Sequence, residues 1–156
     1  MNDQTLVYPW WAVITTWGVV NLVNLLQSAG YLSRILTGRM EINRILGYAI
    51  MVLAIPAGIA LAGFIRAQAD WRQWVGLAVF IVFLLLMISV EYLWQIEFRS
   101  PVNHKILVPY LVLFFGSILL MGLPMFRMDR RLWLVTVATT VLLLTSMVVA
   151  MRRGVG

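Results

Sequence analysis

Cysteine is absent from the 156 residues of this chain, and histidine and lysine occur once each. Without cysteine the protein has no disulfide, no thiol redox centre, no thiolate metal site and no thioether-linked haem. His104 alone rules out a bis-histidine haem and makes a histidine-based metal site a poor hypothesis. Lys105 falls between two apolar segments, so a Schiff base in mid-membrane has no candidate. We therefore expect no metal and no cofactor.

Charged residues are also scarce, at 12% of the chain, whereas 62% of the residues are hydrophobic. A soluble domain has roughly 25% charged and 45–50% apolar residues. A helix of ~20 residues crosses a ~30 Å hydrocarbon core. Five stretches of about that length lack Asp, Glu, Lys and Arg, namely 4–33, 45–65, 73–90, 106–126 and 132–151. We therefore predict an all-α, polytopic integral membrane protein, a bundle of five transmembrane helices that forms one membrane domain over residues 1–156.

The second apolar stretch carries two backbone signals. From the charge pattern we expect helices at about 10–32, 45–65, 74–96, 106–126 and 132–151. Pro56 lies in the middle of the second of these and predicts a kink, because proline lacks the N–H that continues the helical hydrogen bonds. Ala54, Gly58 and Ala62 recur every four residues, and such a stripe lets another backbone approach closely. We expect this stripe to be either the tightest packing face of the bundle or a homodimer face.

The basic residues lie between the apolar stretches and give the chain a net charge of +6. Arginines at membrane edges anchor helices and meet anionic head groups, and no basic helix face suggests nucleic acid. The lipid bilayer is therefore the expected partner. If the N-terminus is outside, the inner side holds Arg34, Arg39, Arg44, Arg99, Lys105, Arg152 and Arg153, and the outer side holds Arg66, Arg72, Arg127, Arg130 and Arg131. This small excess favours an external N-terminus and a cytoplasmic C-terminus in a plasma membrane.

Glu91 is the only acidic residue within an expected helix. Burying a carboxylate in hydrocarbon costs at least a few kcal/mol of free energy, so an acidic residue within a membrane helix is a candidate functional residue. The end of the first helix lies on the same side of the membrane as Glu91, because two crossings separate matching ends. We therefore expect a polar cavity in the inner leaflet, with Glu91 at its centre and Arg34, Gln95, His104 and Lys105 at its mouth. The expected ligand-binding residues are Glu91, Asn21, Asn24, Gln27, Ser28, Tyr31, Arg34, Gln95 and Tyr110.

A structural interpretation of the same residues stays open. Asn21, Asn24 and Ser28 share one helix face, and such side chains often hydrogen-bond between membrane helices as ordinary packing contacts. Glu91 can also pair with a nearby Arg or Lys without any ligand.

Catalytic motifs are missing from the chain. It has no G-x-S-x-G elbow, no H-E-x-x-H, no phosphate-binding Walker loop and no paired aspartates for metal-assisted chemistry. Our first hypothesis is a non-enzymatic membrane protein that binds or transports a small or lipid-like ligand, with dimerisation to complete a path. The alternatives are a structural subunit of a larger membrane complex, and an integral membrane enzyme that acts on a lipid with Glu91 as acid or base.

Overall fold

The computed structural model describes residues 9–38, 41–96 and 103–154. These residues form α1 (Trp10–Thr37), α2 (Glu41–Val52), α3 (Ala54–Arg66), α4 (Trp71–Met87), the π-helical segment η1 (Ile88–Leu93), α5 (His104–Met128) and α6 (Arg130–Arg152), with no strand among them. Arg39 and Arg99, which enter the charge count above, lie outside the described residues.

The helices make up five stretches that are long and apolar enough to cross a membrane. Two of them are composite, because α2 continues into α3 and α4 continues into η1. Large apolar side chains such as Ile55, Val82 and Leu123 are more than half exposed on the outside of the bundle. Such a surface suits lipid tails and not water. The predicted all-α bundle of a polytopic membrane protein is therefore confirmed.

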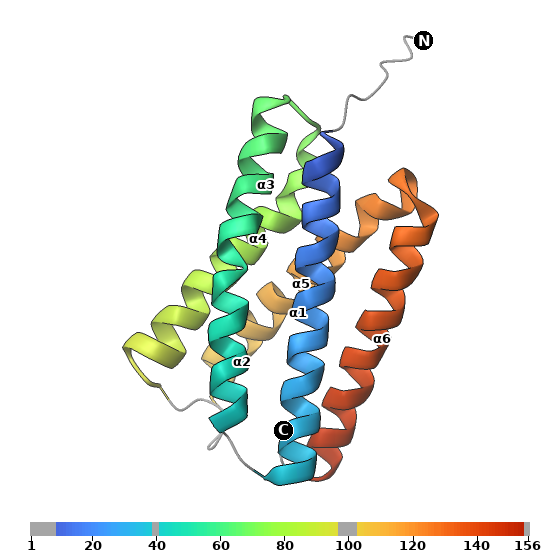
Figure 1. Cartoon of the computed structure of the whole chain (residues 1–156). Helices are drawn as coiled ribbons and strands as arrows, with labels where there is room; N and C mark the ends of the chain where they lie inside the picture. The colour runs from blue at the N-terminus through green and yellow to red at the C-terminus, as the bar shows by residue number, and fades with distance from the viewer. Residues whose placement is uncertain (1–8, 39–40, 97–102, 155–156) are drawn as a thin grey trace.

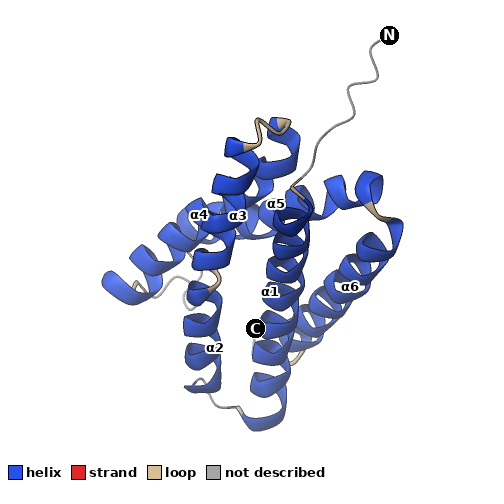
Figure 2. Cartoon of the chain, turned by 45° about the horizontal axis from the view of Figure 1, so that its top comes forward, coloured by secondary structure: helices blue, strands red, loops and turns tan. Residues whose placement is uncertain are grey.

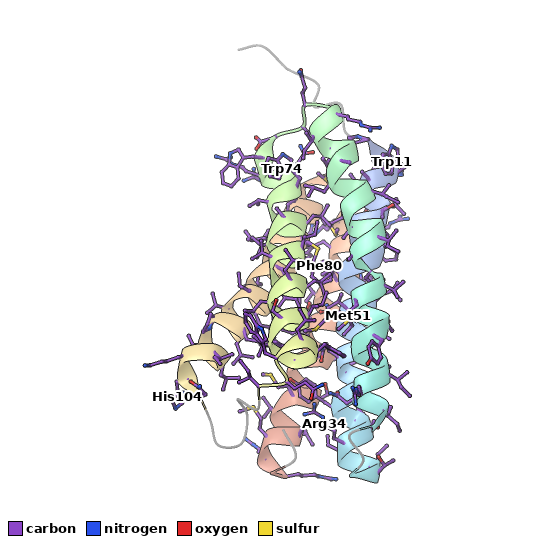
Figure 3. All side chains as sticks on the ribbon, turned by 90° about the vertical axis from the view of Figure 1, so that its left-hand side faces the viewer. Trp11, Arg34, Met51, Trp74, Phe80 and His104 are labelled. Atoms are coloured by element: carbon purple, nitrogen blue, oxygen red, sulfur yellow. The ribbon has the colours of Figure 1, made fainter. Side chains whose placement is uncertain are left out.

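The chain passes back and forth along the bundle, so α1 and α6 run in the same direction (Figure 1). α1 is central and contacts α2, α3, α5 and α6, while α4 packs between α3 and α5 (Figure 2). Trp11 and Trp74 mark one end of the bundle, and Arg34 lies near the other (Figure 3). The ends of α1, η1 and α6 and the starts of α2 and α5 therefore gather at one end.

The helices extend further into the charged segments than the charge pattern predicts. α1 continues to Thr37 instead of stopping near residue 32, and α2 begins at Glu41 instead of residue 45. Gly38 ends α1 in the left-handed conformation, with φ of 64°, and its N–H donates to the carbonyl oxygen of Arg34 at 3.0 Å. Glycine is the residue that adopts this cap without strain. Arg34 therefore belongs to the helix and not to a loop.

Polar N-caps start three other helices. Asp70 caps α4 by accepting from the backbone N–H of Arg72 at 2.9 Å, and Asn103 caps α5. Asp129 caps α6 by accepting from the N–H of Arg131 at 2.7 Å. These caps satisfy N–H groups that have no partner inside the helix, which is why the helices begin two or three residues before the predicted starts.

Near Pro56, where the sequence predicts a kink, the helix is interrupted at Leu53, between α2 and α3. Pro56 cannot donate a backbone hydrogen bond, and its ring crowds the carbonyl group four residues earlier, at Val52. The last residue of α2 is that same Val52. The proline therefore explains where the second span is interrupted.

The third span ends in a π-helix, which no sequence pattern predicts. The N–H of Trp94 donates to the carbonyl oxygen of Ser89 at 2.9 Å, the wider spacing that defines this helix type. The helix stops at Leu93 and not at residue 96, and Gln95 takes a positive φ of 48°. π-helical turns are frequent at functional sites, and this one contains Glu91.

Closest packing lies between α4 and α5, and not at the predicted small-residue stripe. A Cβ added at Gly76 would lie 2.5 Å from the backbone nitrogen of Met121, whereas one at Gly58 would meet nothing within 4 Å. Ala62 is exposed and Ala54 is only half-buried. The expectation that Ala54, Gly58 and Ala62 form the tightest packing face of this chain is therefore wrong. α3 turns another side inward, with Ala57, Ala60 and Phe64 buried. The homodimer alternative stays a prediction.

Candidate functional site

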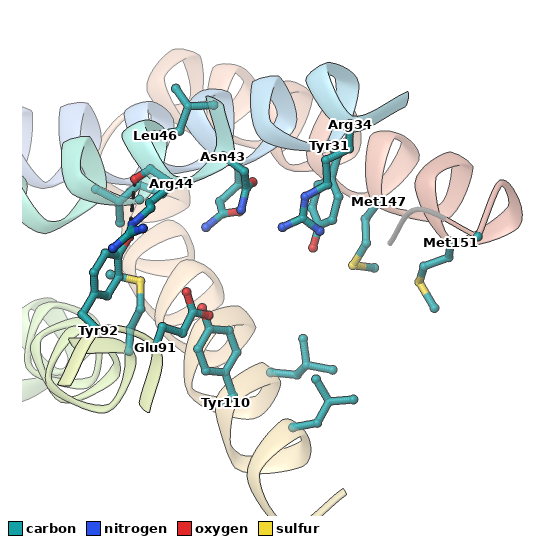
Figure 4. A pocket seen from close by; sticks show the side chains of 17 residues that line it. Tyr31, Arg34, Asn43, Arg44, Leu46, Glu91, Tyr92, Tyr110, Met147 and Met151 are labelled. Carbon is teal, nitrogen blue, oxygen red and sulfur yellow. Dashed lines mark hydrogen bonds between the residues drawn. The ribbon is translucent and has the colours of Figure 1, made fainter. Parts of the chain in front are cut away.

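A cavity of about 600 Å³ lies at the end of the bundle where α1 and η1 finish and where α2 and α5 begin (Figure 4). Every span contributes to its wall. The lining residues are Gln27, Tyr31, Arg34, Asn43, Arg44, Leu46, Gly47, Ile50, Met87, Glu91, Tyr92, Leu107, Tyr110, Leu111, Met147, Met151 and Gly154.

Part of the predicted ligand-binding set comes together in this cavity. Its members there are Gln27, Tyr31, Arg34, Glu91 and Tyr110. They come from α1, η1 and α5, which are far apart in the sequence. The alternation of the spans brings these helix ends to one side of the bundle, as the sequence predicts.

Arg34 is the most deeply placed charge in the wall. The residue is only 5% exposed, and its guanidinium carbon lies 5.9 Å from the centre of the Tyr31 ring. A guanidinium over an aromatic face is attracted by the ring's negative charge. Both side chains point into the cavity from α1, near the α6 side (Figure 4). The helical extension to Thr37 thus turns a predicted loop arginine into part of the site.

Glu91 enters the cavity from the π-helical segment, next to Tyr92 and opposite Asn43 and Arg34 (Figure 4). The Tyr92 hydroxyl donates to the backbone carbonyl oxygen of Arg44 at 3.5 Å, a long hydrogen bond. Two successive residues of the π-helical segment, Glu91 and Tyr92, line the same cavity. The segment therefore presents a carboxylate and a phenol side by side.

Aromatic contacts hold the tyrosines in place. The rings of Tyr48 and Tyr92 lie 5.0 Å apart, and Tyr110 meets Phe83 edge-on at 5.1 Å. Tyr110 is buried with only its surface toward the cavity left open. Rings packed in this way lose little freedom when a ligand binds, which favours a preformed site.

Asn43, Arg44 and Tyr92 belong to the site but were missed by sequence reasoning. The predicted second helix began at residue 45, which left Asn43 and Arg44 in a loop. Gly38 was the available signal, because a glycine after the last helical residue often ends a helix and would have placed the loop earlier. No sequence pattern distinguished Tyr92 from the other tyrosines of the chain.

The opposite wall of the cavity is apolar. Leu107 and Leu111 come from α5, and Met147 and Met151 come from α6. Met151 lines the cavity while its side chain is 63% exposed, so it lies at the rim. The site is therefore amphipathic: charged and hydroxyl groups face a wall of leucine and methionine.

Asn21, Asn24 and Ser28 do not reach the cavity. Asn21 and Asn24 are buried between α1 and α6, where Asn24 Nδ2 donates to Thr139 Oγ1 at 3.1 Å and to Thr140 Oγ1 at 3.0 Å. The Ser28 hydroxyl donates to the backbone oxygen of Asn24 at 2.7 Å. Their placement in the ligand-binding set is corrected, because Asn21 and Asn24 join α1 to α6 and Ser28 bonds within α1. The polar face of α1 thus divides: its first part contacts α6, and its last part lines the cavity.

The predicted mouth is only partly formed. Gln95 follows η1 and is exposed, and it is absent from the cavity wall. His104 and Lys105 begin α5 and are also exposed, with His104 at the outer edge of the bundle (Figure 3). Of the four residues expected at the mouth, Arg34 alone lines the cavity.

In the described part of the chain, no three His, Asp or Glu side chains come together as a metal site would require. Comparisons of the whole chain with protein-family models, with curated proteins and with solved structures find no match. A functional assignment for this chain therefore depends on the geometry of the cavity.

Proposed function

We propose that this is a non-enzymatic integral membrane protein that binds or transports a small or lipid-like ligand in the cavity around Glu91. The supporting observation is the cavity itself, because about 600 Å³ lies within the usual range of ligand sites. Its wall combines a few convergent polar groups with a larger apolar surface, as such sites do.

The remaining volume argues against a purely structural role for Glu91. Protein interiors pack densely, and a carboxylate that serves only as an ion-pair partner needs no space beside it. Glu91 instead lies next to Tyr92 and Tyr110 in a cavity that is open enough to admit a ligand. An enzyme remains the less favoured interpretation, because the described site offers a carboxylate and phenols but no nucleophile paired with a base.

We propose further that the protein resides in a plasma membrane with its N-terminus outside and its C-terminus in the cytoplasm. The support is the excess of Lys and Arg on the side that would be internal. The cavity would then open in the inner leaflet, since it lies at the end of α1 and of α6.

The test is amphiphile retention by the purified chain, measured by native mass spectrometry after incubation with monoolein, phosphatidylcholine, phosphatidylglycerol and oleylamine. Met147→Trp should fill the cavity and abolish retention, while Leu144→Trp, on α6 but outside the cavity, should leave retention intact. Glu91→Gln should change retention, whereas Asp70→Asn at the other end should not, because asparagine also caps a helix. Equal retention by wild type and Met147→Trp would contradict the proposal.

A second candidate is a subunit of a larger membrane assembly. The observation in its favour is the stripe of Ala54, Gly58 and Ala62, in which Ala62 is exposed and a Cβ at Gly58 would meet nothing within 4 Å in the described chain. Another helix could pack closely there. Co-purification of a stoichiometric partner in mild detergent would support this function, and a monodisperse chain with no partner would count against it.

A further inference from the structure

The charged groups of the cavity and much of its apolar lining come from different helices. Arg34, Asn43, Arg44 and Glu91 come from α1, α2 and η1, whereas Leu107, Leu111, Met147 and Met151 come from α5 and α6. Figure 4 shows Arg44 and Glu91 on one side of the cavity and Met147 and Met151 on the other, with Arg34 between them. A ligand that matches both walls has a polar head and a hydrocarbon part.

The charges of the lining residues indicate whether the head of the ligand is anionic or cationic. The described residues of the wall carry two guanidinium groups and one carboxylate, so the lining is positive. An anionic head is attracted by this excess of positive charge, and the planar guanidinium group matches phosphate and carboxylate oxygens geometrically.

Neutral groups in the polar wall are compatible with the same sign. Gln27 and Asn43 carry amide N–H₂ groups, which can donate hydrogen bonds to an oxyanion. A cation would instead approach two guanidinium groups, and the Tyr31 ring already lies under one of them at 5.9 Å.

The position of the apolar wall indicates where the hydrocarbon part lies. α5 and α6 meet at Asp129, at the far end of the bundle, and separate toward the cavity (Figure 1). Met151 lies at the rim of this wall, and exposed Val108 and Val148 lie nearby in the sequence of α5 and α6. Methionine adapts its shape to irregular apolar partners. A hydrocarbon chain can therefore continue from the cavity along lipid-facing surface.

We infer that the ligand is an amphiphile with an oxyanion head, phosphate or carboxylate, and at least one hydrocarbon chain. Arg34 and Arg44 bind the head, and the α5–α6 wall receives the chain. This inference rests on the proposed function and specifies its ligand class.

Oleate and oleylamine provide a matched test, because they share a chain and differ in the charge of the head. Radiolabelled forms are titrated against the full chain, purified in dodecyl maltoside. We expect oleate to bind at least about tenfold more tightly, the effect of about one charge-assisted hydrogen bond. Arg44→Gln should weaken oleate binding about tenfold, whereas Arg66→Gln at the opposite end should not change it. Because Arg34 is buried, Arg44 is the safer substitution for folding.

Glu91→Gln distinguishes an anionic ligand from a cationic one. It removes the single carboxylate of the described wall, so oleate binding should be strengthened. Tighter binding of oleylamine, lost in Glu91→Gln, would overturn the oxyanion inference and leave the proposed function standing. Failure of oleate, oleylamine, monoolein and phosphatidylcholine to bind at all would overturn both.

Competition identifies the source of the oxyanion. Displacement of oleate by dioleoyl phosphatidylglycerol supports a membrane phospholipid, and displacement by unlabelled oleate alone supports a single-chain amphiphile. Both results support the inference. Displacement by sodium phosphate at the same concentration as oleate would show that the chain contributes nothing, and would overturn it.

Discussion

Asn21 of α1 and Thr136 of α6 are hydrogen bonded across the bundle, with Nδ2 donating to Oγ1 at 3.2 Å over a separation of 115 residues. The same separation recurs where Trp17 Nε1 donates to the Leu132 carbonyl oxygen at 3.0 Å. The constant offset shows that the first and last spans are parallel and in register. This junction holds α6 in the place where Met147 can line the cavity.

The α1–α6 junction should contribute measurably to stability. Asn24→Ala removes two hydrogen bonds to Thr139 and Thr140 at a residue that is 0% exposed. We expect the free energy of unfolding to fall by about 1–2 kcal/mol, as for polar contacts between membrane helices. Unfolding of the purified chain in detergent measures this. Thr145→Ala is the control, because that exposed hydroxyl donates only within its own helix. Equal stability of both variants would argue against the junction.

The α4–α5 crossing should tolerate no added methyl group. In Gly76→Ala the new Cβ would meet the backbone of α5, which cannot move aside like a flexible side chain. We expect a loss of about 1–3 kcal/mol of unfolding free energy. Gly116→Ala is the matched control, because nothing lies within 4 Å of its Cβ position. That variant should be neutral or gain up to about 1 kcal/mol, since alanine favours helix. Thermal unfolding compares the pair.

The absence of cysteine permits a direct test of water access, because any introduced thiol is the only one in the chain. Met147→Cys should react quickly with a charged methanethiosulfonate reagent, since that position lines the cavity. Leu144→Cys lies on α6 outside the cavity and should react slowly, because a thiolate forms only in water. Similar rates at both positions would contradict a hydrated cavity.

Orientation can be measured in the same way. Ala67 follows α3 and His104 begins α5, and both are exposed at opposite ends of the bundle. With the N-terminus outside, an impermeant maleimide should label Ala67→Cys in intact cells. His104→Cys should be labelled only after the cells are opened. The reverse pattern would place the cavity in the outer leaflet.

The exposed stripe on α3 makes a separate prediction about assembly. If it is a homodimer or subunit interface, Gly58→Leu should shift the purified protein to a smaller species on size-exclusion chromatography with light scattering. The intramolecular structure should hold, because nothing within the described chain lies near that position. If wild type and Gly58→Leu have the same molar mass, the stripe is not an interface.

The sequence predicted those site residues that can be identified from helix direction and charge alone. Glu91 and Arg34 were singled out as a rare acid in an apolar helix and a basic residue at a helix end, and both line the cavity. Asn24 shows the limit of that reasoning. Its spacing on α1 is compatible with a cavity or with a neighbouring helix, and the threonines of α6 that bind it are 115 and 116 residues away.

The sequence by itself determined the five spans, their alternation and the helix break near Pro56, because these depend on local hydrophobicity, length and the chemistry of one proline. Tertiary structure alone decided which glycine packs closely, where the π turn falls and which polar face meets a helix or a cavity. Those outcomes depend on how side chains from distant spans fill the same space. Periodicity along one helix carries no information about its neighbours.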